Sequence, residues 1–289
     1  MAKPTQQPVA TVTALHPGDP QVAAPRIQPP AAHGAIRLTG VSMLFRRNGI
    51  ATPALNDVGL AVRPGEFVSL LGPSGCGKST LLNLIAGILQ PTAGAVEIDG
   101  APVREPNPTC NVVFQQHSLF PWMRVLENVA FGPRMLGHAN PEGVARTFLS
   151  LVGLERFSKA YPVMLSGGMQ QRVAIARALA TYPPVLLMDE PFGALDAQTR
   201  SIMQEELLKI WAQFGTTVVF ITHDVDEAIF LSDRIVVMRT QPGAIKEEIT
   251  VDLPRPRTPA MMLSDRFTAL RGRVISLIRE ETLKVFQNS

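Results

Sequence analysis

Residues 68–84, VSLLGPSGCGKSTLLNL, decide the fold of this 289-residue chain. The apolar run 68–71 predicts a buried strand, and the apolar positions Leu81 and Ile85 predict a helix after it. The stretch 72–79 between them has the spacing GxxxxGKS, which is typical of a phosphate-binding loop, or P-loop. A chance glycine-rich turn is the alternative, and the strand–loop–helix context argues against it. The segment therefore predicts an α/β fold built around a phosphate site.

The residue types in this loop suit the binding of phosphate. Gly72, Gly75 and Gly77 allow a tight turn and leave the backbone open to an approaching phosphate. The exposed N–H groups and the helix N-terminus then form a cradle for an anion. Lys78 can reach the terminal phosphates of a nucleotide, and the Ser79 hydroxyl can ligate Mg²⁺.

Composition narrows the class of protein. The chain is 46% hydrophobic and 18% charged, which is enough apolar material for a substantial core. Its net charge of +3 is too small to indicate nucleic-acid binding by itself. Cys76 and Cys110 do not make a disulfide framework, so a reducing cytosol is expected. No apolar run approaches the roughly 18 residues that cross a bilayer, and the N-terminus lacks a signal-peptide core, so we expect a soluble chain.

The N-terminal residues 1–34 are rich in Pro, Ala and Gln. Such a composition cannot bury enough surface to offset the entropy of ordering, so a disordered tail is expected. A polyproline segment that docks a partner is the alternative. Order is expected from residue 35 onward.

Five short strands are expected around the P-loop segment, and their spacing suggests an antiparallel β subdomain beside the nucleotide core. Phe45 lies in one of them, where it could belong to the core or could stack on an adenine ring. Gln115 directly follows the last strand. The expected strands are 36–38, 41–45, 60–62, 94–98 and 109–114.

A mostly helical insert is expected over about residues 118–175. Ser166 is a suitable N-cap for a helix that runs to about Ala180. Gly167 and Gly168 follow in its first turn, although a glycine in a helix interior costs about 1 kcal/mol relative to alanine. A cap does not require them, whereas close approach of a phosphate to the backbone does.

Two further buried strands are expected to end in polar residues. The run 185–188 ends in Asp189 and Glu190, where Asp189 suits a Mg²⁺ ligand and Glu190 can accept a proton from water. A solvated acidic pair is the alternative. The run 217–222 ends in His223, at the sheet edge where α/β proteins bind ligands, although a structural histidine is equally compatible with the pattern.

The C-terminal part is expected to add a strand at 235–238 and an amphipathic helix over 264–289. Phe267, Leu270, Val274, Leu277 and Ile278 share one face of that helix. Its solvated side is expected to carry Arg271, Arg273 and Arg279.

Over residues 36–249 the chain resembles the ATP-binding subunits of ABC transporters. GPSGCGKST resembles their Walker A motif, VLLMDE their Walker B motif, and LSGGMQQR the signature that separates this family from other P-loop ATPases. The resemblance implies a set of ATP-binding residues: Phe45, Gly72, Pro73, Ser74, Gly75, Cys76, Gly77, Lys78, Ser79, Thr80, Ser166, Gly167 and Gly168.

The resemblance also implies roles for the residues around the phosphates. Ser79, Gln115 and Asp189 would hold Mg²⁺, while Glu190, His223 and Gln115 would be catalytic. Residues 194–196 match the D-loop. Phe45 matches the aromatic residue of the A-loop, which is more often Tyr in the family, so it can stack but cannot donate a hydrogen bond.

The fold implied is a RecA-like P-loop NTPase core with an antiparallel β subdomain and the inserted helical subdomain, together spanning 35–263. The subunits would form a head-to-tail homodimer that holds two ATP molecules between one P-loop and the opposite signature. The helical insert would dock transmembrane permease subunits at the cytoplasmic face of the inner (plasma) membrane. A periplasmic solute-binding protein would be an indirect partner, and no nucleic acid is expected.

The segments LFPWMRVLENVAFG, DEPFGALDAQTR and VDLPRPR resemble the nitrate/sulfonate/taurine importers. ATP hydrolysis would then drive import of a small anion of that kind. A non-transport ABC-type ATPase acting on nucleic acid or the ribosome is the alternative; such proteins typically carry two fused cassettes or long coiled-coil insertions, and neither pattern is found. A P-loop kinase is a third option, but it leaves LSGGMQQR unexplained.

Overall fold

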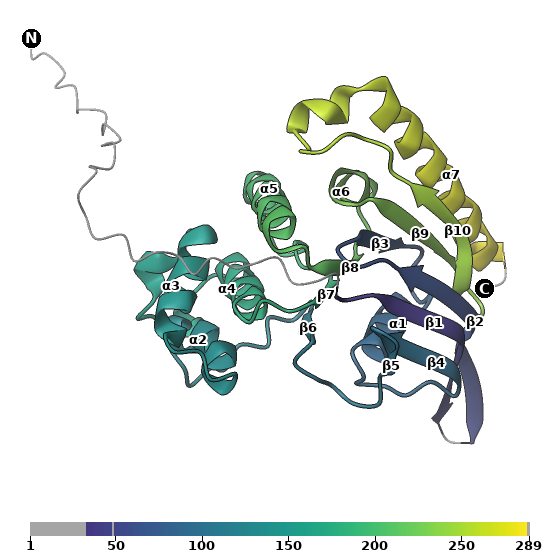
Figure 1. The fold of residues 1–289 in the computed structure, drawn as a ribbon. Coiled ribbons are helices and arrows are strands. Elements are labelled where there is room, and N and C mark those ends of the chain that lie inside the picture. Colours follow the sequence, from purple (N-terminus) through teal and green to yellow (C-terminus); the bar gives the residue numbers. More distant parts are fainter. Residues whose placement is uncertain (1–32, 48, 288–289) are drawn as a thin grey trace, which may run out of the picture.

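The computed structural model describes residues 33–47 and 49–287. The expectation of a disordered tail therefore falls almost entirely outside the described residues. Two sheets share one end of the molecule, and a group of helices forms the other end (Figure 1).

The larger sheet has six strands in the order β10-β9-β3-β8-β7-β6. All neighbouring pairs are parallel except β9 and β10. Every residue of the two central strands β3 and β8 is buried, which confirms the expected strands covered on both faces. The strands are β3 (Phe67–Leu71), β6 (Cys110–Val113), β7 (Val185–Asp189), β8 (Thr217–Ile221), β9 (Arg234–Arg239) and β10 (Ala244–Thr250).

The smaller sheet is antiparallel, in the order β2-β1-β4-β5. Helix α1 (Lys78–Ile85) packs between the two sheets and contacts β2, β4, β7 and β8. Its buried leucines join one core cluster with both sheets. The strands are β1 (Ile36–Arg47), β2 (Ile50–Val62), β4 (Ala93–Ile98) and β5 (Ala101–Pro102).

Three sequence-based expectations about strands are corrected here. Residues 36–38 and 41–45 lie in one strand, β1, and 60–62 is only the end of the 13-residue strand β2. Of the stretch 109–114, residues 110–113 form β6, which pairs in parallel with β7 and belongs to the nucleotide core rather than to the antiparallel subdomain. Strand β10 was not expected.

The helical end of the molecule is built from α2 (Val125–Met135), α3 (Pro141–Leu151) and α4 (Gly167–Leu179), which contact one another. Two short 3-10 turns, Glu155–Phe157 and Pro162–Met164, connect α3 to α4. Helix α4 also contacts β6, so it joins this helical end to the six-stranded sheet. The expected helical insert and its last helix are present.

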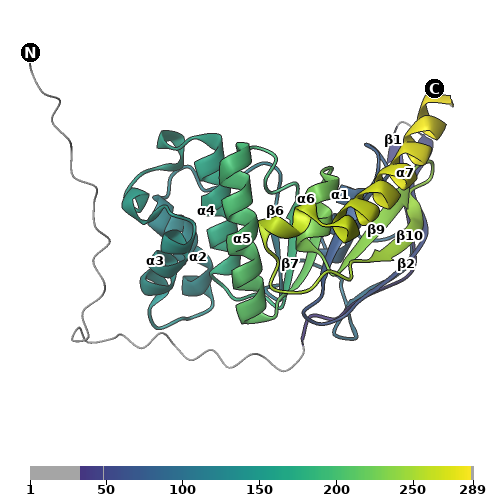
Figure 2. The ribbon, with the colours of Figure 1, turned by 90° about the horizontal axis from the view of Figure 1, so that it is seen from above.

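The remaining helices are α5 (Ala197–Phe214), α6 (Val225–Leu231), a 3-10 helix (Pro259–Leu263) and α7 (Asp265–Gln287). Helix α7 runs along β9 and β10 and reaches α6 at its N-terminal end (Figure 2). Phe267 and Val274 are fully buried, as the amphipathic pattern predicts. Arg273 and Arg279 are exposed, as expected of the solvated side. Arg271 is half-buried instead, because it forms an ion pair with Asp226 of α6, while Arg273 pairs with Glu247 at the surface. Across residues 33–47 and 49–287, no helix is both long and apolar enough to span a membrane.

Candidate nucleotide site

The phosphate loop leaves β3 at the middle of the sheet and ends at the first turn of α1. Gly77 is the N-cap of α1 and has φ = 93°, a backbone conformation that favours glycine. A Cβ atom on Gly77 would lie 2.6 Å from Leu55 Cδ2 and 3.0 Å from the carbonyl oxygen of Ala54. Strand β2 therefore packs so closely on the loop that only glycine fits at position 77.

The Lys78 ammonium folds over this loop. Its Nζ donates hydrogen bonds to the carbonyl oxygens of Gly72 (2.8 Å) and Pro73 (3.1 Å). The loop borders a cavity of about 300 Å³ in which the ammonium, backbone N–H groups and the helix N-terminus can meet a polyphosphate. The lining residues are Ala54, Ser74, Gly75, Gly77, Lys78, Ser79, Thr80 and Glu190.

Cys76 belongs to the loop but turns its thiol inward. Its side chain is fully buried in the core between the two sheets, and burial raises the pKa of the thiol. The Cys76 side chain therefore anchors the loop to the core, and a role of its backbone in phosphate binding stays a prediction.

The Ser79 side chain forms a hydrogen bond with Asp189 beside the P-loop cavity. Burial raises the pKa of Asp189, and a hydrogen bond from the Ser79 side chain acts in the opposite direction. A hydroxyl and a carboxylate are hard oxygen ligands of the kind that Mg²⁺ prefers, so this pair fits a magnesium ion bound beside nucleotide phosphates. A divalent cation would also offset the cost of burying the Asp189 charge.

Glu190 contacts two side chains that follow the ends of neighbouring strands. Its Oε2 accepts a hydrogen bond from Gln115 Nε2 at 3.1 Å and lies 3.5 Å from His223 Nδ1. These three residues follow β6, β7 and β8, whose carboxyl ends lie at the same edge of the sheet. The three predicted catalytic residues are thus brought together beside the P-loop cavity. Of the predicted Mg²⁺ ligands, Gln115 contacts Glu190, whereas Ser79 and Asp189 contact each other.

The signature residues lie elsewhere in the same chain. The Ser166 hydroxyl caps α4 by accepting from Met169 N at 3.3 Å, as predicted. None of Ser166, Gly167 and Gly168 lines the P-loop cavity. Packing explains one of the two glycines, because a Cβ on Gly168 would lie 3.0 Å from Leu195 Cδ2. The start of the signature helix therefore packs closely against residues 194–196, the segment that matches the D-loop.

Phe45 lies on β1 opposite Thr52 of β2, and 42% of its surface is exposed. The alternative in which Phe45 belongs to the core is therefore excluded. Phe45 is also absent from the residues that line the P-loop cavity, so stacking on adenine stays a prediction.

Two features of the site were missed by sequence reasoning. One is the contact of β2 with the loop, together with the backbone of Gly243, which donates to Ala54 O at 3.1 Å. The other is the buried Glu227, which accepts hydrogen bonds from Thr222 and from Gln204 Nε2 (2.9 Å). Neither feature is part of a short sequence motif. The pattern of apolar and polar residues around β10 and α6 gave no sign of them either.

The fold and this site define a P-loop ATPase. The model of the ABC transporter family matches residues 55–193, and the chain belongs to the ATP-binding proteins of that family. It is therefore an ABC-type ATPase.

An ABC transporter ATP-binding protein of Methanocaldococcus jannaschii is 49% identical over 251 residues, covering 86% of this chain and 93% of that protein. The nitrate import ATP-binding protein NrtD of Synechocystis sp. is 44% identical, with 84% and 95% covered. The aliphatic sulfonates import ATP-binding protein SsuB of Bacillus cereus is 45% identical, with 83% and 94% covered.

Solved structures of ATP-binding cassettes have the same fold as this chain. The ATP-binding cassette MJ0796, in a dimeric post-hydrolysis state bound to ADP and Pi, is 35% identical with a TM-score of 0.68. The match covers 76% of this chain and all of that one.

Proposed function

We propose that this chain is the ATP-hydrolysing subunit of an importer, and that a head-to-tail homodimer couples hydrolysis to transport of a small anion such as nitrate, a sulfonate or taurine. The observation that carries the proposal is the meeting of Gln115, Glu190 and His223 at the edge of the P-loop cavity. Relatives named as nitrate and sulfonate import proteins support the solute class.

The chain's own residues divide the chemical work. Lys78 and the loop N–H groups bind the β- and γ-phosphates, and Ser79 with Asp189 hold Mg²⁺. The metal, when bound, neutralises charge on the phosphate oxygens. Glu190 accepts the proton of the attacking water, because it lines the cavity and its Oε2 is already oriented by Gln115. His223, which also lies at Glu190 Oε2, would contact the γ-phosphate.

The position of the signature supports the proposed dimer. Ser166 and Gly168 do not line the cavity of their own chain, and the helix N-terminus that they begin is suited to phosphate. A second copy, turned head to tail, would bring this N-terminus to the opposite cavity. The dimeric state of related cassettes supports this arrangement.

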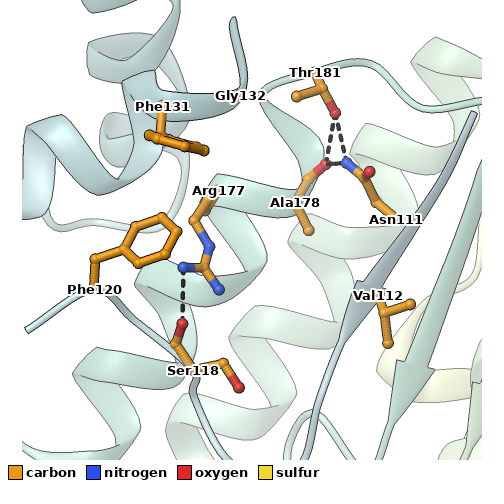
Figure 3. A pocket seen from close by; sticks show the side chains of 9 residues that line it. All are labelled: Asn111, Val112, Ser118, Phe120, Phe131, Gly132, Arg177, Ala178 and Thr181. Atoms are coloured by element: carbon orange, nitrogen blue, oxygen red, sulfur yellow. Dashed lines mark hydrogen bonds between the residues drawn. The ribbon is translucent and has the colours of Figure 1, made fainter. Parts of the chain in front are cut away.

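A second pocket supports docking of a permease. It has a volume of about 270 Å³ and lies between β6, α2 and α4, beside the segment that follows Gln115 (Figure 3). Phe120 and Phe131 pack at 4.9 Å between ring centroids on one side of it. The Arg177 guanidinium lies 5.3 Å from the Phe120 ring and donates to Ser118 O at 2.9 Å.

The pocket thus combines aromatic rings with one guanidinium. Such a lining fits a cytoplasmic helix of a membrane subunit that carries apolar residues. The carbonyl or acidic groups at the end of that helix would face Arg177. Burial lowers the pKa of Arg177, so a negative partner would be favoured there. The nearby Trp122 is 70% exposed and extends the apolar surface. The chain would then lie at the cytoplasmic face of the inner membrane, with the periplasmic binding protein contacting only the membrane subunits.

Calorimetry with Mg²⁺ tests the nucleotide site. Lys78→Ala removes a charge-assisted contact to the phosphates, so ATP affinity should fall by at least about tenfold. Lys159→Ala is the matched control, because Lys159 is exposed and lies outside the cavity. Equal affinity of the Lys78 variant and the native protein would contradict the assignment.

Uptake assays test the transport role. Cells that lack the chain should lose uptake of labelled nitrate, sulfonate or taurine, and the Lys78 variant should fail to restore it. Sedimentation of the protein with ribosomes, together with normal uptake in its absence, would instead favour a non-transport ATPase.

A further inference from the structure

Helix α7 holds the first turn of α6 through one two-pronged ion pair. Arg271 of α7 donates from Nη2 to Asp226 Oδ2 at 2.8 Å and from Nε to Asp226 Oδ1. The guanidinium also lies 5.2 Å from the ring of Phe267, which is fully buried. A planar fork bonded to both carboxylate oxygens fixes orientation as well as distance.

Asp226 is bonded directly to the turn that carries His223. Its backbone N–H donates to Asp224 Oδ1 at 2.9 Å, and the N–H of Asp224 donates to Thr222 Oγ1 at 3.0 Å. The residues on both sides of His223 are therefore tied into the start of α6. Any rotation of this first turn changes the direction in which His223 points.

The His223 ring itself is weakly held. Its side chain is 71% exposed, and its ion-pair contact is with Glu190 Oε2 at 3.5 Å. Its orientation toward the γ-phosphate must therefore come from the backbone of the turn. On the side of α5, Arg200 Nη1 lies 3.7 Å from Asp224 Oδ2, and Gln204 donates to the buried Glu227.

We propose that Arg271 is a positioning residue for ATP hydrolysis, and that α7 acts as a brace that sets His223 through Asp226. The proposal rests on the role of His223 in the proposed function. It also gives the C-terminal helix a part in catalysis, because movement of α7 would release one of the two supports of the turn and so change the rate of the chemical step.

The chain contains a matched control for this brace. Arg273 lies two residues further along α7 and pairs with Glu247 of β10, so it joins the same helix to the sheet but not to α6. In the purified full chain, Arg271→Gln should lower kcat by roughly 3- to 30-fold, which is the usual range of coupling through a positioning contact. KM for ATP should change by less than about twofold, because Lys78 and the P-loop, which bind most of the phosphate oxygens, are left unchanged. Arg273→Gln should leave both constants unchanged.

Conservative variants separate positioning from folding. Arg271→Lys keeps the charge but loses the fork, so its kcat should lie between those of the native protein and Arg271→Gln. Asp226→Asn removes the pair from the other side and should reproduce the effect of Arg271→Gln. Hydrogen exchange of a peptide spanning residues 222–227 should be faster in both Arg271→Gln and Asp226→Asn and unchanged in Arg273→Gln, whether or not the activity is high.

A double-mutant cycle with His223→Ala tests the route of the effect. If Arg271 acts through His223, then Arg271→Gln should cause no further loss of kcat in the His223→Ala background. Full additivity, or equal effects of the Arg271 and Arg273 variants, would overturn the brace. If His223→Ala itself hydrolyses ATP at the native rate, the failure lies in the proposed role of His223, and the exchange data still decide whether α7 holds the turn.

Discussion

Glu190 has a backbone φ of 47°, in the left-handed region that non-glycine residues rarely occupy. Its N–H donates to Ile221 O at 3.0 Å, so the neighbouring strand β8 holds this conformation in place. Strain of this kind costs on the order of 1–3 kcal/mol and is concentrated at functional sites. Here it turns the carboxylate out of β7 and toward Gln115 and His223.

Glu190→Gln should therefore separate binding from chemistry. The amide keeps the size of the side chain but cannot accept the proton of water, so kcat should fall by about 10²- to 10⁴-fold. ATP affinity should be retained, because Glu190 need not contact the phosphates before reaction. Single-turnover hydrolysis measures the first quantity, and size exclusion with ATP should show an accumulated dimer. A rate within a few-fold of the native protein would make His223 the next candidate base.

Glu227 makes stability depend on pH. Burial raises its pKa above the ordinary value of 4.5, despite opposing hydrogen bonds from Thr222 and Gln204. The folded state therefore binds the proton more tightly than the unfolded chain. The stabilisation is complete below the unfolded pKa and is lost as pH rises through the folded pKa.

Glu227→Gln should remove this loss. The free energy of unfolding of the variant, relative to that of the native protein, should increase as pH rises from about 4.5 toward neutrality. Urea unfolding at a series of pH values measures the difference. A difference that stays constant over this range would show that Glu227 titrates alike in both states.

At the scale of elements, Arg234 joins β9 to the start of β3. Its guanidinium donates to Glu66 Oε1 at 2.9 Å and to Oε2 at 3.1 Å, and the Glu66 side chain is only 3% exposed. Arg63 also pairs with Glu66, at 3.4 Å, but 80% of its side chain is exposed. One carboxylate thus has a buried and an exposed partner.

Arg234→Met should destabilise the fold by about 3–5 kcal/mol, because it leaves a buried carboxylate without its main partner. Arg63→Met should cost only about 0–1 kcal/mol, since an exposed pair contributes little. Urea denaturation of the two variants compares them directly. Equal losses would mean that the Arg234 pair is no stronger than a surface contact.

Elements with strong local patterns were predicted well. The buried runs of β3, β7 and β8, the Ser166 cap and the amphipathic face of α7 all follow from short stretches of sequence. Strand β10 escaped because it is an edge strand whose few buried positions are interrupted by Lys246, Glu247 and Glu248. Strand β6 was placed in the wrong sheet because its partner, β7, lies far away along the chain.

The same distinction applies to the site. The glycine spacing predicts the P-loop, and the adjacent carboxylates predict the roles of Asp189 and Glu190. Each of these patterns is contained in a short stretch of sequence. The approach of Ala54 and the Arg271–Asp226 pair depend on tertiary packing between distant segments, which no local pattern records.

At the scale of the whole molecule, one chain offers a P-loop cavity at one place and a signature helix at another. Ser166→Arg should therefore inactivate the ATP site whose P-loop belongs to the partner chain. Lys78→Ala should inactivate the ATP site built on the P-loop of the variant chain itself. Each variant alone should be inactive.

Mixing these two variants should restore part of the activity. In a mixed dimer, one composite site carries both defects and the other carries neither. ATP hydrolysis by mixtures that are shown to contain mixed dimers is the measurement. Activity no higher than that of either parent would contradict the head-to-tail arrangement.

The position of β3 also bears on how the protein is made. Its two neighbours in the sheet, β8 and β9, come from residues 217–239, so most of the chain must leave the ribosome before β3 finds a partner. The antiparallel sheet needs only residues 36–102 and can form much earlier. Unpaired apolar strand edges invite association with other chains. During synthesis, the strand that leads into the P-loop therefore stays without a strand partner until residues 217–239 have been made.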